Sequence, residues 1–275
     1  MKIFKIIKST NDRILLQADI DSFTFWCGKN SLTLNPLKCQ TITFTKKRIV
    51  SVFDYCISQQ KLCRVSTFKD LGVHFCSNLE FTHHINFIVN KASSMLGFIK
   101  RWAKEFNDPY VTLSLYNCHV RPHLEYASQV WTPYYEIHKK RIESIQHNFI
   151  RFALKGLPWD DPYDLPPYEH RILLLQMQSL HQRRVNNDLV FFHQLINGEI
   201  DAPYLLSCVH LNYRGGTHHL RTFDFIHIDF HRTNYGKNEA LSRMSILYNL
   251  NCSSIDLNLN KVGLKSLFRT SAPLS

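Results

Sequence analysis

Residues 82–103, THHINFIVNKASSMLGFIKRWA, hold the pattern that decides the fold. Apolar side chains recur here every three or four residues, which is the spacing of one face of an α-helix. The positions on this face are Ile85, Ile88, Val89, Ala92, Leu96, Ile99 and Ala103. The stretch therefore predicts an amphipathic helix of roughly six turns whose apolar side packs against other helices.

Before this helix the sequence favours short strands. A first strand is expected at residues 2–7, and a helix from Asp12 to about Cys27 follows a capping segment at residues 9–12. Segments rich in β-branched and aromatic residues then alternate with turn residues, which is typical of a small antiparallel sheet. The expected strands of this sheet are residues 41–45, 54–58, 61–65 and 71–75.

After residue 103 helices dominate. Asp108 caps a helix with Pro109 at its first position, and Arg121-Pro122 breaks or kinks it. A further helix is expected over about residues 135–154, with Ile142, Ile145, Phe149 and Ala153 facing inward. A Pro-rich linker at 156–167, a Leu-rich helical segment at 168–197 and an irregular tail follow. The predicted class is α+β, a small antiparallel sheet followed by a mostly α-helical bundle and a helical or irregular tail.

The composition indicates an ordinary globular chain with a basic surface. Hydrophobic residues make up 44% of 275 residues, and 33 Lys and Arg against 22 Asp and Glu give a net charge of +11. Residues 1–50 alone hold nine basic and three acidic side chains, a local excess of +6, which favours a polyanion as partner. No membrane span, secretion signal, C-x-x-C pair or phosphate-binding glycine loop is found, so we expect an intracellular protein, cytoplasmic or nuclear or both, with reduced cysteines.

Several segments, taken together in this order and spacing, resemble the C-terminal part of a non-LTR (LINE-type, jockey-like) retrotransposon reverse transcriptase. The first half of the resemblance is carried by residues 16–20 (LQADI), Trp26, 30–39 (NSLTLNPLKC), 68–73 (FKDLGV) and 79–85 (LEFTHHI). The second half is carried by residues 96–101 (LGFIKR), 121–127 (RPHLEYA), 142–146 (IESIQ), 167–171 (PYEHR) and, in the tail, 232–236 (RTNYG).

The resemblance implies a division of the chain. Residues 1–78 would be a C-terminal remnant of the polymerase palm, with a fourth-motif-like stretch at 34–38 and a primer-grip-like segment around Leu71-Gly72. Residues 79–155 would be a helical, thumb-like region. Residues 156–167 would be the Pro-rich linker, and residues 168–275 a C-terminal helical extension.

The resemblance also implies what chemistry to expect. The parent activity is RNA-directed DNA polymerisation, which uses Mg²⁺ held by aspartates. In this family an aromatic-Ala-Asp-Asp turn precedes the strand that here begins at Met1. Asp19 and Asp21 point to different faces of a helix, and Asp160-Asp161 lie in the linker. We therefore expect no catalytic residue, no metal site and no cofactor in this chain alone, and no polymerisation by it.

The candidate nucleic-acid-binding residues are of three kinds: lysines and an arginine in loops, a primer-grip-like turn, and the end of the long helix. They are Lys38, Lys46, Lys47, Arg48, Phe68, Leu71, Gly72, Lys100 and Arg101. Cations in such positions contact phosphates and give strongly salt-dependent binding with little base readout.

Each candidate has a plainer interpretation. Lys38 could be a surface lysine after a turn, and residues 46–48 a solvated loop. Leu71 could be a buried residue at a strand junction, and Trp102, beside Lys100-Arg101, could close the helical core.

Two further patterns favour structure over function. His227, Asp229 and His231 alternate and would share one face of a strand, but the apolar residues between them favour a half-buried strand over a metal site. Arg183-Arg184 interrupts a Leu-rich helix and is interpreted as its solvated face.

The function expected from the sequence is that of a C-terminal reverse transcriptase fragment that binds RNA/DNA duplex or primer–template. No membrane or small-molecule substrate is expected. The alternative is a domesticated helical protein-interaction module without nucleic-acid binding. A third possibility is that residues 1–78 lack the strands they would pair with and do not fold stably.

Overall fold

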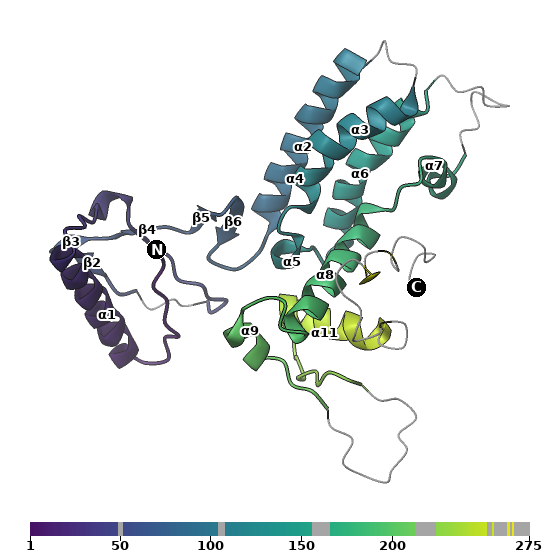
Figure 1. The fold of residues 1–275 in the computed structure, drawn as a ribbon. Coiled ribbons are helices and arrows are strands. Elements are labelled where there is room, and N and C mark those ends of the chain that lie inside the picture. Colours follow the sequence, from purple (N-terminus) through teal and green to yellow (C-terminus); the bar gives the residue numbers. More distant parts are fainter. Residues whose placement is uncertain are drawn as a thin grey trace, which may run out of the picture. The chain divides into compact units, whose positions relative to one another are not determined.

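The computed structural model describes residues 1–48, 52–103, 108–155, 166–212 and 224–251, together with residues 255, 263, 264 and 266. The chain divides into two compact units, Met1–His84 and Ile85–Ser275 (Figure 1). The expected linker at 156–167 lies almost wholly outside the described residues. The assignment of 1–78, 79–155 and 168–275 to parts of a polymerase stays a prediction.

The first unit is organised around helix α1 (Thr10–Lys29). Its start is fixed by a capping box: the Ser9 hydroxyl accepts from the Asp12 N–H, and the Asp12 carboxylate accepts from the Ser9 N–H at 2.7 Å. The side-chain amide of Gln17 then bonds both the N–H and the carbonyl of Cys56, at 3.0 and 2.9 Å. One side chain thus ties the helix to the backbone of a strand.

The strands of this unit are short and form three separate pairs. β1 (Gln40–Thr41) runs parallel to β4 (Cys63–Arg64), and β2 (Cys56–Ile57) runs antiparallel to β3 (Gln60–Lys61). β5 (Thr67–Asp70) and β6 (Val73–Cys76) form an antiparallel hairpin. A small core of Ile20, Tyr55, Ile57 and Leu62 lies beneath them.

The strand expectations were therefore only partly correct. Residues 1–7 form no strand, because no neighbouring strand among the described residues offers its backbone for hydrogen bonding. The strand expected at 71–75 begins at Val73 instead, since Leu71 and Gly72 form the turn of the hairpin. The class α+β is confirmed.

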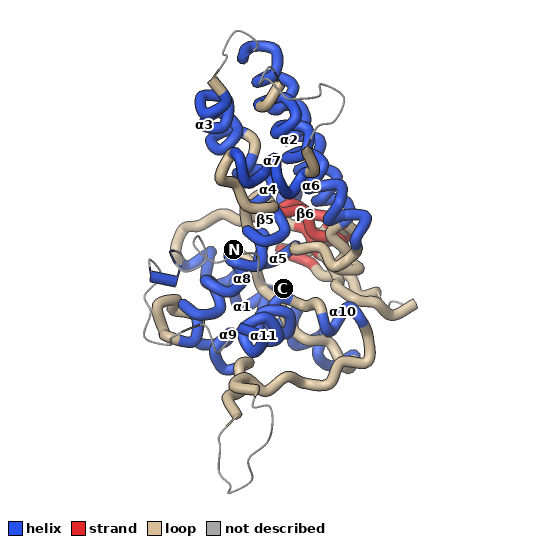
Figure 2. Tube along the Cα trace, turned by 90° about the vertical axis from the view of Figure 1, so that its right-hand side faces the viewer, coloured by secondary structure: helices blue, strands red, loops and turns tan. Residues whose placement is uncertain are grey.

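The second unit is helical (Figure 2). Its long helices are α2 (Thr82–Trp102, whose first turn starts in the first unit), α3 (Pro109–His119), α6 (Glu136–Ala153), α8 (Leu180–Ile196) and α11 (Ala240–Asn251). Its short helices are α4 (Arg121–Glu125), α5 (Ser128–Trp131), α7 (Tyr168–Leu174), α9 (Pro203–Ser207) and α10 (Asn234–Lys237). A 3-10 turn in the first unit, η1, spans Pro36–Lys38.

The core of the second unit follows the sequence pattern. Every position of the apolar stripe quoted for residues 82–103 is buried, and so are Ile142, Ile145, Phe149 and Ala153 of α6. The Asp108 carboxylate caps α3 by accepting from the Tyr110 N–H at 2.8 Å. The helix ends at His119, and α4 begins at Arg121, where the proline was expected to interrupt it.

A second apolar cluster joins α8 to α11. Phe192 and Leu189 of α8 pack with Met244 and Tyr248 of α11, and Ile226 completes the contact. Among the described residues, no helix combines the length and the apolar character needed to cross a membrane.

Candidate nucleic-acid interface

Lys38 lies at the end of the η1 turn. The side-chain oxygen of Asn35 accepts from the Leu37 N–H at 3.0 Å, and the Lys38 N–H donates to the Asn35 carbonyl at 3.1 Å. Asparagine before proline thus builds the turn locally. The Lys38 side chain is exposed, so its ammonium is accessible to an anion.

The basic run Lys46-Lys47-Arg48 leaves the base of the β5–β6 hairpin. The Thr45 N–H donates to the Ser77 carbonyl at 2.9 Å, and the rings of Phe44 and Phe68 lie 6.2 Å apart. All three basic side chains are exposed. Phe68 also stacks on Phe75 at 5.3 Å and is half-buried, so packing within the hairpin accounts for this ring.

The hairpin turn places Leu71 in an unusual conformation. Asp70 pairs with Val73, and between them Leu71 has φ +44° and Gly72 φ +90°. A two-residue turn with both φ angles positive matches the twist of a hairpin, but normally uses Asn or Asp before Gly. The Leu71 side chain is 80% exposed, so its interpretation as a buried junction residue is wrong. Local folding does not explain why a leucine stands there.

Lys100 and Arg101 end helix α2. The Lys100 ammonium lies 5.8 Å from the ring centre of Phe152 on α6, and Arg101 is exposed. Burial, with a smaller contribution from the nearby positive charge of Arg151, lowers the pKa of Lys100. Trp102 is 69% exposed, so the interpretation that it closes the core is wrong.

Sequence reasoning missed two cations that α6 brings to the same place. Helices α2 and α6 lie side by side and run in the same direction (Figures 1 and 2), with Arg141 bonded to Asn86 near their starts and Lys100 beside Phe152 near their ends. Arg151 lies near enough to Lys100 to contribute to its lowered pKa, and Lys155 follows two residues after α6 ends; both side chains are exposed. The two basic residues are visible in the sequence, but the proximity of Arg151 to Lys100 of α2 could not be predicted from it.

Of the predicted residues, the structure thus places Lys38, residues 46–48, Phe68, Leu71 and Gly72 in the first unit, and Lys100 and Arg101 in the second. It brings Phe68 next to the start of the basic run, and it brings Lys100 next to Arg151. Their roles in binding stay predictions.

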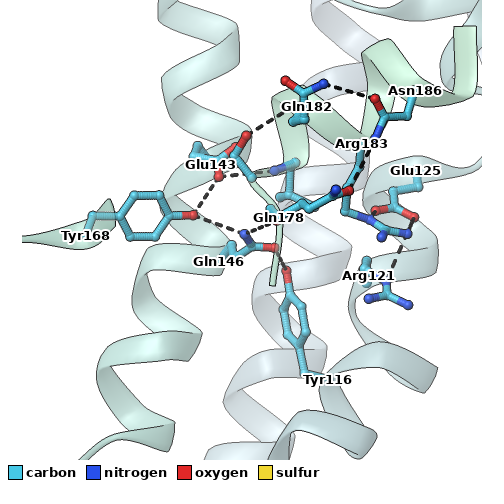
Figure 3. A network of polar contacts seen from close by, with 12 residues as sticks. Tyr116, Arg121, Glu125, Glu143, Gln146, Tyr168, Gln178, Gln182, Arg183 and Asn186 are labelled. Atoms are coloured by element: carbon cyan, nitrogen blue, oxygen red, sulfur yellow. Dashed lines mark hydrogen bonds and ion pairs between the residues drawn. The ribbon is translucent and has the colours of Figure 1, made fainter. Parts of the chain in front are cut away.

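Three of the segments that carry the family resemblance, residues 121–127, 142–146 and 167–171, contribute to a polar network between helices of the second unit (Figure 3). The Gln146 side chain, which is fully buried, accepts from the Tyr116 hydroxyl at 3.1 Å and donates to the Tyr168 hydroxyl and the Gln178 carbonyl, both at 3.0 Å. The Tyr168 hydroxyl in turn donates to Glu143 at 2.6 Å. Burial raises the pKa of both tyrosines, so both stay protonated donors.

The same network contains an ion pair between helices. Arg183 of α8 donates from two nitrogens to Glu125 of α4, one contact being Nη2 to Oε2 at 2.9 Å, and Arg121 lies 3.9 Å from the same carboxylate. The hydrogen bond to Glu125 raises the pKa of Arg183. Arg184 is fully buried. The expectation that Arg183-Arg184 is a solvated helix face is therefore wrong, because α8 is enclosed by α4, α5, α6 and α11.

A second buried ion pair joins α11 to α8. Arg243 donates from Nε to Asp188 at 2.9 Å and from Nη2 to the Gln129 carbonyl of α5 at 2.8 Å. Burial raises the pKa of Asp188 to about 6, although the neighbouring Arg243 opposes the shift. These contacts tie α11 to α8 and α5.

The His227, Asp229, His231 set does not lie on a strand. Residues 227–231 form no regular strand, and Phe230 is 88% exposed, so the expected half-buried strand is wrong. His231 instead lies 2.8 Å from the Ser242 hydroxyl. Within the part of the chain that the structure describes, no group of three His, Cys, Asp or Glu side chains is placed to hold a metal ion.

Comparison with known proteins gives a partial match to a polymerase. The chain is 29% identical over 148 residues to the RNA-directed DNA polymerase from mobile element jockey of Drosophila funebris. This match covers 52% of the chain and 16% of that protein. The chain is related to the reverse transcriptases of non-LTR retrotransposons.

A second relative has no described function. An uncharacterised protein of Caenorhabditis elegans is 23% identical over 135 residues, which is 49% of the chain and 66% of that protein. The chain thus spans less than two thirds of the length of either relative. No family model matches it, and no solved structure matches it.

Proposed function

We propose that this reverse-transcriptase-related chain binds primer–template duplex through phosphate contacts. The observation that carries the proposal is the group of cations where α2 and α6 end: Lys100, Arg101, Arg151 and Lys155. Among the described residues none of these four is in an ion pair. A duplex backbone supplies the negative charge that the described residues around this group do not supply.

The electrostatics of this group support an anionic ligand. The lowered pKa of Lys100 reflects burial and repulsion by Arg151, so the protonated ammonium is destabilised in the free protein. A phosphate between these side chains relieves the repulsion and stabilises both charges. The jockey relative is named an RNA-directed DNA polymerase, and we propose that this chain contributes duplex binding to such an enzyme, without nucleotidyl transfer by itself.

Salt dependence of duplex affinity tests the proposal. Four phosphate contacts predict a slope of about −3.6 in log affinity against log salt, or a loss of about 150-fold between 50 and 200 mM salt. We would measure it by fluorescence anisotropy with a labelled blunt RNA/DNA duplex. Replacing Arg101 or Lys155 by Gln should reduce the slope by about 0.9 each.

Lys139→Gln is the matched control, because Lys139 lies on the same helix α6 but pairs with Glu136 at 2.8 Å. This variant should keep the full slope. A duplex affinity that does not fall as salt rises contradicts the proposal. So does a salt slope that is reduced equally in Arg101→Gln, Lys155→Gln and Lys139→Gln. Absence of duplex binding, together with capture of a protein partner, would favour the protein-interaction module instead.

A further inference from the structure

The outward face of α2 carries aromatic and basic side chains in alternation. Phe87, Lys91, Phe98, Arg101 and Trp102 are separated by four, seven, three and one residues, which places them on one side of the helix. All five are exposed. The aliphatic residues of α2 occupy the opposite, buried side. Core packing therefore accounts for the aliphatic side chains and leaves the aromatic ones unexplained.

Phe98 and Trp102 form the centre of this face. They are 49% and 69% exposed, and their ring centres lie 5.9 Å apart with an angle of 43° between the planes. The two rings contact each other, and both keep much of their surface accessible to solvent. Ordered aromatic surfaces of this kind are what unpaired bases stack on.

The positive charge of this face disfavours a positively charged partner. Residues 82–102 contain no Asp or Glu, and Lys91, Lys100 and Arg101 are spread over the second half of the helix. Arg151 of the neighbouring α6 adds to the positive charge near Lys100, and Lys155 follows just after α6 ends. The aromatic rings of α2 thus stand between cations, with no carboxylate on the helix. This combination fits a polyanion with flat apolar groups.

Those flat groups must be accessible. In a duplex the faces of the bases are stacked on one another and hidden, so only a single strand can offer them to Phe98 and Trp102.

We propose that the outward face of α2 binds single-stranded nucleic acid, with unpaired bases stacked on Phe98 and Trp102 and with Lys91 and Arg101 on the phosphates. The inference rests on the proposed function and extends it. The group at the ends of α2 and α6 holds duplex phosphates, and the outward face of α2 holds the bases of an unpaired overhang. Replacing the aromatic rings should therefore affect single strands and leave blunt duplex binding intact.

The test uses the full chain and two probes, a labelled twelve-nucleotide oligo(dT) and a labelled blunt duplex. Phe98→Leu and Trp102→Leu keep an apolar side chain but remove the π-face. Each should weaken oligo(dT) binding by about 5-fold to 150-fold, the effect of one lost base stack, while the duplex affinity stays within about twofold. Phe230→Leu, at another exposed aromatic position of the same unit, should change neither affinity.

A second measurement locates the contact directly. Oligo(dT) in which thymines are replaced by 5-iodouracil cross-links to an aromatic ring in contact with the base, and mass spectrometry should find the adduct on Phe98 or Trp102. Duplex binding without oligo(dT) binding overturns this inference alone. Failure of both probes to bind the unaltered chain overturns the proposed function as well. Equal loss of both affinities in the Leu variants, or adducts only elsewhere, also contradicts stacking on α2.

Discussion

Gln146 offers the sharpest test of how the second unit is held together. Its side chain is fully buried and makes hydrogen bonds to the Tyr116 hydroxyl, the Tyr168 hydroxyl and the Gln178 carbonyl. Gln146→Leu keeps the volume roughly constant and removes all of these bonds. Tyr168 retains Glu143 as a partner, but the buried Tyr116 hydroxyl loses its bond to Gln146.

The expected loss follows from the fate of that hydroxyl. Leaving the buried Tyr116 hydroxyl unsatisfied costs about 1–3 kcal/mol, and the two other lost hydrogen bonds contribute about 1 kcal/mol each, so Gln146→Leu should lower the free energy of unfolding by about 3–5 kcal/mol. Tyr116→Phe alone strands the Gln146 oxygen and should cost about 1–2 kcal/mol. In the double variant neither group is stranded, so its loss should fall short of the sum by about 1 kcal/mol or more.

Urea unfolding, followed by tryptophan fluorescence, measures these differences, because the indole of Trp131 is buried within the second unit and becomes exposed when this unit unfolds. Gln182→Leu is the matched control. The Gln182 side chain donates to Asn186, a partly buried residue on the same helix, so this variant should change stability by less than about 0.5 kcal/mol. Losses that simply add in the double variant would refute the reasoning that Tyr116 depends on Gln146 for its hydrogen bond.

Further outcomes follow from buried charge and backbone strain. Arg243→Met leaves buried Asp188 without its ion pair and should lower the free energy of unfolding in urea by about 3 kcal/mol or more, whereas Arg184→Met should cost less than about 1 kcal/mol. The reverse order would contradict this ranking of the two arginines. Because burial raises the pKa of Asp188 from 3.8 to about 6, the folded chain holds that proton more tightly than the unfolded chain, so its contribution to stability falls as the pH rises from about 4 to about 6. Asp188→Asn should remove that slope from urea midpoints measured across this pH range, and an unchanged slope would assign it to other groups. Leu71→Asn suits the positive φ of the hairpin turn and should stabilise the first unit by about 0.5–1 kcal/mol while weakening duplex affinity measured by anisotropy. Undiminished affinity would remove Leu71 from the candidate site.

The sequence by itself determined the elements whose pattern is local. The stripe from Ile85 to Ala103 required a helix with one buried side, since residues three and four apart share a face whatever surrounds them. Asp108 before Pro109 fixed a helix start for an equally local reason, because a carboxylate at this position accepts from a nearby backbone N–H. The resemblance to a reverse transcriptase was also contained in the sequence, and the jockey relative confirms it.

Only the tertiary structure decided which segments meet. Pairing of short strands depends on neighbours that are distant in the chain, so the shift of the last strand to Val73 and the exposure of Leu71 could not be predicted from composition. The burial of Arg184 depends on four helices that enclose α8. Likewise, Lys100 and Arg151 are about fifty residues apart in the chain, and only the parallel packing of α2 and α6 makes them one group of like charges. Periodicity specifies which face of a helix is buried, but the partner of that face, and so the surface that remains for a ligand, is set by packing.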